Sequence, residues 1–393
     1  MKKPLIRRPP HRAQQAGLLA LALLAGCASP PTPPRGNDAH VQQFVGKGYL
    51  SEEQFSLHTA PVAWLENGRS FDFMLSVPVR PGRYPLVIYL PGLGESRTAG
   101  DGWRNTWAQA GYAVLSIQLL GEDTQAWQSP AARHGDFTHL ARERYAEGLM
   151  ADRQAALRGL LAALHHHSGD ALLQNVDLSR VVMAGYDLGA YTAMVAAGEK
   201  YGTAEAAPLP LAGVIALSPH ADFSGPAFTT RYGAVNVPVL SVTGQGDVDG
   251  YGLVTSAALR SAPFQHMPPG NKYLLMLDDA SHEMFGGNPL GTADGNRDDQ
   301  RPSGGEEKAG RGEGHKGRRG SMEGGQGMPR RGRDEAGGGS ASGGRDWAFS
   351  LSAIRAVTTA FLDAQIKNDE FAQEWLRRDA RRWLRDTAQL TVK

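Results

Sequence analysis

Short runs of consecutive apolar residues alternate with longer segments of helical periodicity from about residue 70 onward. The runs are apolar at successive positions, which indicates strands that are buried on both faces of a sheet. The predicted strands are residues 71–79, 85–90, 112–120, 181–186, 212–219, 237–244 and 272–279.

Segments with apolar residues at helical spacing separate or follow these strands. The predicted helices are residues 103–111, 139–166, 188–198, 347–369 and 370–386. Buried strands that alternate with helices are typical of a parallel sheet covered by helices on both faces. The sequence therefore predicts an α/β protein with a mostly parallel central sheet.

Residues 286–346 break this alternation. The segment is rich in glycine and mixed charges and has almost no large apolar side chains, so we expect a disordered insertion. Its arginine–glycine pieces are compatible with RNA or anionic lipid, but its acids nearly balance its bases, which favours a solvated segment and no nucleic-acid partner. Amphipathic helices resume afterwards, so the insertion interrupts one domain, predicted over residues 51–393.

The first 27 residues have the features of an export signal. Basic residues precede an apolar stretch, residues 16–26, that is too short to span a bilayer. The stretch ends in Leu-Ala-Gly-Cys, which resembles a bacterial lipobox, and Cys27 is the only cysteine in the chain. The alternative is an ordinary signal peptide with a chance cysteine.

The lipobox resemblance implies that Cys27 is lipidated and anchors an exported bacterial lipoprotein to the cell envelope, at the outer membrane or facing the periplasm if the cell is Gram-negative. Residues 28–50 begin with a proline-rich run and are expected to form a tether. The domain beyond the tether is expected to be a soluble monomer.

Overall composition adds little to this picture. The net formal charge is +1 over 393 residues, which gives no argument for an acidic or nucleic-acid partner. The sequence has no phosphate-binding loop, and we expect no cofactor and no metal. The histidine run at residues 165–167 ends a predicted helix, where solvent exposure is a commoner explanation than metal binding. The expected partner is a small-molecule substrate.

The most informative motif lies at residues 181–194. An apolar strand enters the tight turn Gly-Tyr-Asp-Leu-Gly, residues 185–189, and a helix of small residues follows. This is the pattern of a nucleophile elbow, G-x-S-x-G, in which the glycines permit a sharp turn and the central residue projects from its apex. An aspartate, Asp187, stands where that motif has serine.

Two later strands run into loops that carry an acid and a histidine. Asp247 and Asp249 follow the strand at residues 237–244, and His282 follows the strand at residues 272–279. The order of nucleophile, acid and histidine is that of the α/β-hydrolases.

A glycine-rich turn follows the strand at residues 85–90. Such a turn can direct backbone N–H groups at a developing negative charge. The N–H group of Leu188 would supply the other half of such an oxyanion hole.

From about residue 84 to 287, and again from about 354 to 376, the chain resembles bacterial dienelactone-hydrolase-like and platelet-activating-factor-acetylhydrolase-like α/β-hydrolases. The segments that carry the resemblance are PLVIYLPGLGESR, GYDLGAYTAMVAAGE, VPVLSVTGQGD, PPGNKYLLMLDDASHEMFGG and AVTTAFLDAQIKND. The resemblance implies an α/β-hydrolase fold and an enzyme that acts on small esters or lactones. It implies Asp247 as the orienting acid, favoured over Asp249 by the register of the motif, and His282 as the base. It also implies the backbone N–H groups of Leu93 and Leu188 as the oxyanion donors.

The chain departs from this family at three positions. Asp187 replaces the family's serine, while Tyr186 and Pro91 replace two histidines. A serine nucleophile therefore does not carry over.

An aspartate at the elbow is ionised at neutral pH and can attack without help from a base. Epoxide hydrolases and haloalkane dehalogenases place an aspartate at this turn. Leu188 stands where dehalogenases usually have a halide-binding tryptophan. No lid is apparent between residues 219 and 237. Tyr186 and Tyr232 are available as donors of a proton to a leaving oxygen.

Three hypotheses follow for Asp187. It is the nucleophile of a hydrolase, acting on esters or lactones or, alternatively, on epoxides or alkyl halides. In the second hypothesis, Asp187 belongs to a catalytically degenerate protein that binds a ligand or partner at the cell envelope. In the third, Asp187 caps the following helix, a role compatible with either of the other two.

Overall fold

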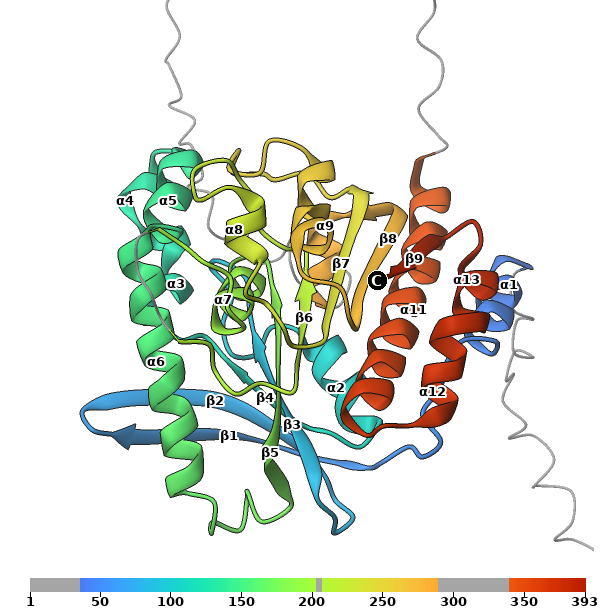
Figure 1. The fold of residues 1–393 in the computed structure, drawn as a ribbon, viewed down its shortest axis with the longest axis horizontal. Coiled ribbons are helices and arrows are strands. Elements are labelled where there is room, and N and C mark those ends of the chain that lie inside the picture. Colours follow the sequence, from blue (N-terminus) through green and yellow to red (C-terminus); the bar gives the residue numbers. More distant parts are fainter. Residues whose placement is uncertain (1–35, 203–206, 289–338) are drawn as a thin grey trace, which may run out of the picture.

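The structure is a computed structural model that describes residues 36–202, 207–288 and 339–393 (Figure 1). The expected signal peptide, the expected lipidation residue Cys27 and most of the expected insertion lie outside these ranges. No helix within them is long and apolar enough to cross a membrane.

A nine-stranded sheet forms the centre of the molecule, in the order β1-β2-β4-β3-β5-β6-β7-β8-β9. The strands are β1 Leu57–Glu66, β2 Arg69–Pro78, β3 Tyr84–Leu90, β4 Ala113–Ile117, β5 Val176–Tyr186, β6 Gly213–Leu217, β7 Val239–Gly246, β8 Lys272–Ser281 and β9 Ala388–Val392. All pairings from β4 through β8 are parallel, and β1, β2 and β9 join antiparallel at the two edges. The α/β class with a mostly parallel sheet is confirmed, and it is consistent with an α/β-hydrolase-like fold.

Helices cover both faces of this sheet. They are α1 Gly36–Val45, α2 Asp101–Gln109, α3 Gly121–Thr124, α4 Pro130–Arg133, α5 Phe137–Arg144, α6 Glu147–His166, α7 Leu188–Ala196, α8 Phe228–Tyr232, α9 Ala262–His266, α11 Gly339–Ile366, α12 Glu370–Glu374 and α13 Ala380–Leu384. Short turns of other helical types are η1 Ala126–Gln128, η2 Ala257–Ser261, η3 His282–Gly286 and η4 Trp375–Asp379.

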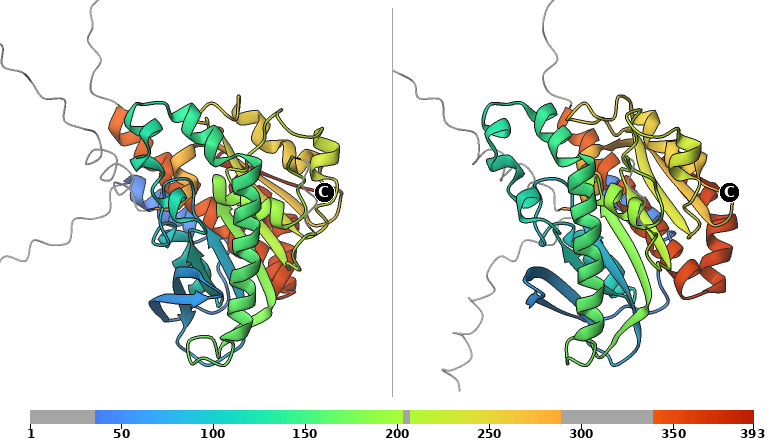
Figure 2. Two further views of the ribbon diagram at one scale, coloured as in Figure 1. Left: turned by 90° about the vertical axis from the view of Figure 1, so that its left-hand side faces the viewer. Right: turned by 60° about the vertical axis from the view of Figure 1, so that its left-hand side comes forward.

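The layers follow from the alternation of side chains along each strand. Val182 and Ala184 of β5 pack with α2 and α11, whereas Val181 and Met183 pack with α6 and α7. Figure 2 shows the sheet between α6 on one side and α11 on the other. Burial on both faces is the physical reason why the central strands are continuous apolar runs.

The two outermost strands, β1 and β9, lack the continuous apolar runs from which the central strands were predicted. Most positions of β1 are exposed or half-buried, and β9 alternates buried with exposed positions. An edge strand needs few apolar residues because solvent covers one side of it.

The structure corrects the helix expected over residues 139–166. Two helices, α5 and α6, occupy the segment, and the chain turns between them at Tyr145 and Ala146. Ala146 has φ −61° and ψ 149°, an extended conformation that cannot continue a helix.

Described residues also fall within the expected tether and the expected insertion. Residues 36–45 form α1, and Tyr49 is buried with its hydroxyl donating to Asp363 Oδ2 at 2.8 Å. Helix α11 begins at Gly339, within the last residues of the expected insertion.

Candidate active site

The elbow forms where the sequence predicts it, between β5 and α7. Asp187 has φ 53° and ψ −112°, a strained conformation for a residue with a side chain. A Cβ at Gly189 would lie 1.9 Å from the carbonyl oxygen of Leu90, and a Cβ at Gly185 would lie 2.3 Å from the backbone of Gly189. The turn therefore requires glycine at both flanks.

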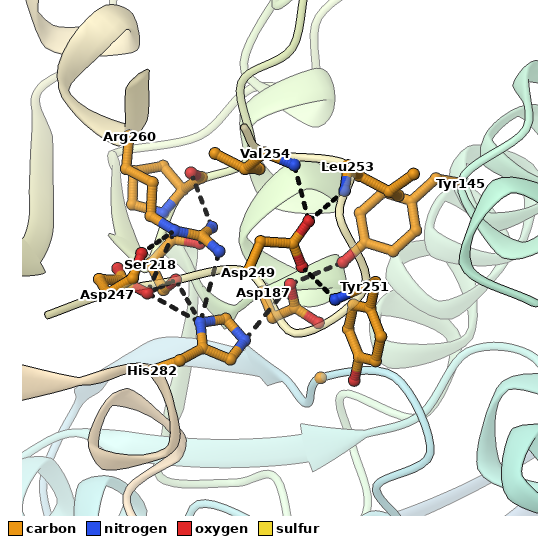
Figure 3. A network of polar contacts seen from close by, with 12 residues as sticks. Tyr145, Asp187, Ser218, Asp247, Asp249, Tyr251, Leu253, Val254, Arg260 and His282 are labelled. Atoms are coloured by element: carbon orange, nitrogen blue, oxygen red, sulfur yellow. Dashed lines mark hydrogen bonds and ion pairs between the residues drawn. The ribbon is translucent and has the colours of Figure 1, made fainter. Parts of the chain in front are cut away.

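The expectation that Asp187 caps α7 is wrong. Asp187 occupies the N-cap position, but its side chain makes no capping hydrogen bond to the helix. Its carboxylate points toward other side chains at the carboxyl edge of the sheet (Figure 3).

Three predicted residues meet at this edge. Nδ1 of His282 lies 2.8 Å from Oδ1 of Asp247, and Nε2 of His282 lies 3.9 Å from Oδ1 of Asp187 (Figure 3). They follow β8, β7 and β5, which are parallel strands whose carboxyl ends share one edge.

The other candidate acid, Asp249, accepts hydrogen bonds from its own loop. The carboxylate of Asp249 accepts the backbone N–H groups of Tyr251 at 3.0 Å, of Val254 at 2.6 Å, and also of Leu253. These bonds shape its own loop. The geometry thus places Asp247, and not Asp249, against His282.

Asp247 is fully buried and held by residues that no sequence motif indicated. Ser218 Oγ donates to its Oδ1 at 2.9 Å, Thr243 Oγ1 donates to its Oδ2 at 2.7 Å, and Arg260 Nε lies 3.1 Å from Oδ1. A buried carboxylate is costly unless it is paired in this way. Ser218 and Arg260 are distant in sequence, so only the fold brings them to Asp247.

His282 is enclosed between two carboxylates. Burial alone would lower the pKa of His282, but the hydrogen bond to Asp247 and the charge of Asp187 outweigh burial and raise this pKa above its usual value. Within the described residues, Nε2 has no hydrogen-bond partner. The 3.9 Å to Asp187 is longer than a hydrogen bond.

A tyrosine that the sequence did not indicate contacts the elbow. Tyr145, at the turn between α5 and α6, donates its hydroxyl to Oδ1 of Asp187 at 2.7 Å. Burial, together with the charge of Asp187, raises the pKa of Tyr145 well above its usual range, so the phenol stays neutral. Its ring stacks on Tyr191 at 6.1 Å between centroids.

Tyr186 and Tyr232, the two candidate proton donors from the sequence, do not contact Asp187 in this way. Tyr186 packs its ring 5.1 Å from that of His282. Tyr232 is fully buried and donates its hydroxyl to the backbone oxygen of His220 at 3.4 Å. Neither donates to Asp187 in the structure; Tyr145 does.

The expected oxyanion donors, Leu93 and Leu188, are both buried. In the part of the chain that the structure describes, neither backbone N–H donates to a protein acceptor. The loop before Leu93 is held by Glu95, whose carboxylate accepts the N–H of Gly92 at 2.9 Å and the side-chain amide of Asn288 at 2.8 Å. Both N–H groups are thus available for a ligand.

A cap covers the site, and it lies between β4 and β5, not between β6 and β7. The segment from α3 to α5 follows β4, and its Ala126 and Leu140 share one buried cluster with Leu93 and Leu188. Asp187 and His282 have side chains only 5% and 11% exposed. Both side chains are therefore largely shielded from solvent.

A buried ion pair attaches the cap to α6. Arg153 donates to both carboxylate oxygens of Asp123 at 2.8 and 2.7 Å, and neither side chain is more than 1% exposed. The carbonyl oxygen of Asp123 accepts the N–H of Gly94 at 2.9 Å. This pair thus links the cap to the loop that carries Leu93 and Gly94.

No protein-family model matches the chain, and no curated protein matches it either. The fold is consistent with an α/β-hydrolase-like architecture, and an aspartate stands at the strand–helix turn. Because one fold hosts many activities, the function has to be argued from the site.

Proposed function

We propose that this protein is a hydrolase in which Asp187 is a covalent nucleophile, His282 activates water and Asp247 orients His282. The observation that carries the proposal is the alignment of the three groups, with the unpaired Nε2 of His282 facing Asp187 at 3.9 Å. A carboxylate needs no base for its own attack, so the histidine is free for a later step.

In the first step, a carboxylate oxygen of Asp187 bonds to an electrophilic carbon of the substrate, and the bond from that carbon to the leaving oxygen breaks. The leaving oxygen keeps the electron pair and takes the proton of the Tyr145 hydroxyl. An epoxide fits these contacts best, since its oxygen leaves from a saturated carbon and needs one proton donor. The product is an ester of Asp187.

In the second step, Nε2 of His282 removes a proton from water, and the hydroxide adds to the side-chain carbonyl carbon of Asp187. The N–H groups of Leu93 and Leu188 stabilise the resulting oxyanion. Its collapse releases an alcohol and restores the carboxylate. The proton on His282 returns to the Tyr145 phenolate.

The ester also changes the charge beside His282. The charge of Asp187 is one cause of the raised pKa of His282. Ester formation removes that charge, so the pKa of His282 falls and the imidazole becomes a base at the step that needs one.

The experiment is a turnover and trapping assay on the purified full chain. The panel contains small epoxides, short alkyl halides, p-nitrophenyl esters and lactones. In His282→Ala the second step is blocked, so mass spectrometry should find the substrate attached to Asp187; Asp187→Asn should show no such adduct. Absence of both turnover and adduct across the panel contradicts the proposal.

Small esters and lactones are the second substrate class, supported by the unoccupied N–H groups of Leu93 and Leu188. Attack of Asp187 on an ester carbonyl would form a mixed anhydride, which water then opens. If Asp187→Ser gains esterase activity, the remaining groups are arranged for acyl transfer.

A ligand-binding protein without catalysis is the second candidate function. It is favoured by the carboxylate of Asp187, which is only 5% exposed and already accepts the Tyr145 hydroxyl. An inert chain that still binds a panel compound, equally well in His282→Ala, would support this candidate.

We also propose that the chain is exported and lipidated at Cys27. The support is the order of basic segment, apolar stretch and lipobox-like residues. Cells fed an alkyne analogue of palmitate should label the full chain and not Cys27→Ser. Equal labelling of both would contradict lipidation at this residue.

A further inference from the structure

A cluster of possible metal ligands lies at the end of α6 remote from Tyr145. Glu66 ends β1, and His166 and His167 end α6, beside the β1–β2 hairpin (Figure 1). Helix α6 has 20 residues. At about 1.5 Å per residue the cluster is therefore about 30 Å along the helix from the proposed active site.

The spacing of the donor atoms suits one small cation. Oε1 of Glu66 lies 2.8 Å from Nε2 of His167 and 3.4 Å from Nδ1 of His166. All three donor atoms lie within 4.8 Å of one another. Tetrahedral zinc with bonds of about 2.0–2.1 Å holds its ligand atoms about 3.3 Å apart. Both distances from Glu66 Oε1 lie within about 0.5 Å of that separation.

His167 is already oriented as a metal-binding histidine usually is. Its Nδ1 lies 2.9 Å from Oδ2 of Asp170, which leaves Nε2 directed at Glu66. A carboxylate on the second ring nitrogen fixes a ligand's orientation and strengthens its donor atom. The ring of Trp64 stacks on His167 at 4.2 Å and 12°, which holds the imidazole from a third side.

Space and charge at this position also suit a cation. Glu66 and His166 line a surface pocket of about 350 Å³, and the side chain of His166 is 72% exposed. Water can therefore complete the coordination of an ion. The carboxyl end of a helix carries partial negative charge, which favours a cation there.

We propose that Glu66, His166 and His167 bind one Zn²⁺ ion, with Asp170 orienting His167. The histidine run at residues 165–167 shows no ligand spacing of its own, which is why no metal is expected from the sequence alone. The third ligand, Glu66, comes from β1. The bound ion joins the hairpin to α6. This site is independent of the proposed hydrolase. The competing state is an ion pair in which protonated His167 bridges two carboxylates.

The test is calorimetric titration of the full chain with zinc chloride, with magnesium chloride as the control metal. Imidazole ligands favour zinc over magnesium, so only zinc should bind, with one equivalent per chain. His166→Ala should weaken zinc binding by about 100-fold, on the scale of lost ligand-sphere contacts. His166 is mostly exposed, so this variant should fold normally.

His165→Ala is the matched control, since His165 is the exposed neighbour of His166 and is not part of the cluster. It should bind zinc like the original chain. Zinc should also raise the Tm of the original chain and of His165→Ala, but not of His166→Ala. No zinc binding at about 100 µM free ion, or equal binding by both variants, overturns the proposal in favour of the ion pair or of a different site.

Discussion

Nε2 of His282 faces Oδ1 of Asp187 across 3.9 Å, too far for a hydrogen bond and close enough for strong electrostatic coupling. In a serine hydrolase the histidine would deprotonate the elbow residue. Here the elbow residue is an acid, and its charge favours the protonated imidazole. The two residues therefore have a different relationship from that of the serine and histidine in a serine triad.

Replacing Asp187 by Asn should lower the pKa of His282. Asparagine is neutral, like the proposed ester, and removes one of the two carboxylates that raise this pKa. NMR titration of the His282 ring in both chains measures the change. An unchanged or higher pKa in Asp187→Asn would remove the proposed coupling between ester formation and base strength.

The same shift has a consequence for stability. The folded-state pKa of His282 is raised above the usual 6.5. Its contribution to stability is therefore complete below pH 6.5 and is lost as pH rises through the folded-state pKa. Asp187→Asn should flatten this part of the curve of unfolding free energy against pH.

Asp247→Asn should reduce turnover by about 10³- to 10⁴-fold, because the asparagine no longer holds His282 in the required tautomer. Asp249→Asn is the matched control, since the carboxylate of Asp249 accepts backbone N–H groups of its own loop. It should change turnover by less than about tenfold. Steady-state kinetics of the two variants decide which aspartate orients His282. A larger loss of turnover in Asp249→Asn than in Asp247→Asn would assign that role to Asp249.

Tyr145→Phe should slow epoxide opening by about 100-fold or more, because the leaving oxygen loses its proton donor. Alkyl halides need no such proton, so their turnover should fall much less. Tyr191→Phe, a change in the ring that stacks on Tyr145, is the control and should leave both rates near their original values. Equal losses on both substrates would indicate that Tyr145 only positions Asp187.

Gly189→Ala should destabilise the protein by about 3 kcal/mol or more, because the new methyl group would meet the backbone oxygen of Leu90 at 1.9 Å. Gly148→Ala is the comparison, since nothing lies within 4 Å of a Cβ there. Within a helix, that change should alter stability by less than about 1 kcal/mol. Urea denaturation of the two variants measures the difference; similar values would mean that the elbow is less tightly packed than described.

Arg153→Ala should cost about 3–5 kcal/mol, because it leaves the buried carboxylate of Asp123 without its partner. Arg142→Ala on exposed α5 should change stability by less than about 0.5 kcal/mol. Amide hydrogen exchange should also rise in the cap, residues 121–144, of Arg153→Ala. Unchanged exchange there would show that other contacts hold the cap in place.

Much of the fold was predictable because its signals are local. The central strands are apolar at every position, so each could be recognised from its own residues. The elbow was predictable for a similar reason, since Gly185 and Gly189 are required by close backbone contacts within and beside one turn. Strands β1 and β9 have no such pattern, because edge positions tolerate polar side chains.

The sequence by itself determined the α/β class, the turn that presents Asp187, and the order in which Asp247 and His282 follow it, because these depend on short-range periodicity and on steric limits of the backbone. Only the tertiary structure decided that Tyr145 donates to Asp187, that Ser218 and Arg260 hold Asp247, and that Glu66 meets the histidines of α6. Those contacts join residues far apart in the chain. Their partners are selected by how helices and loops pack around the sheet, which no local pattern encodes.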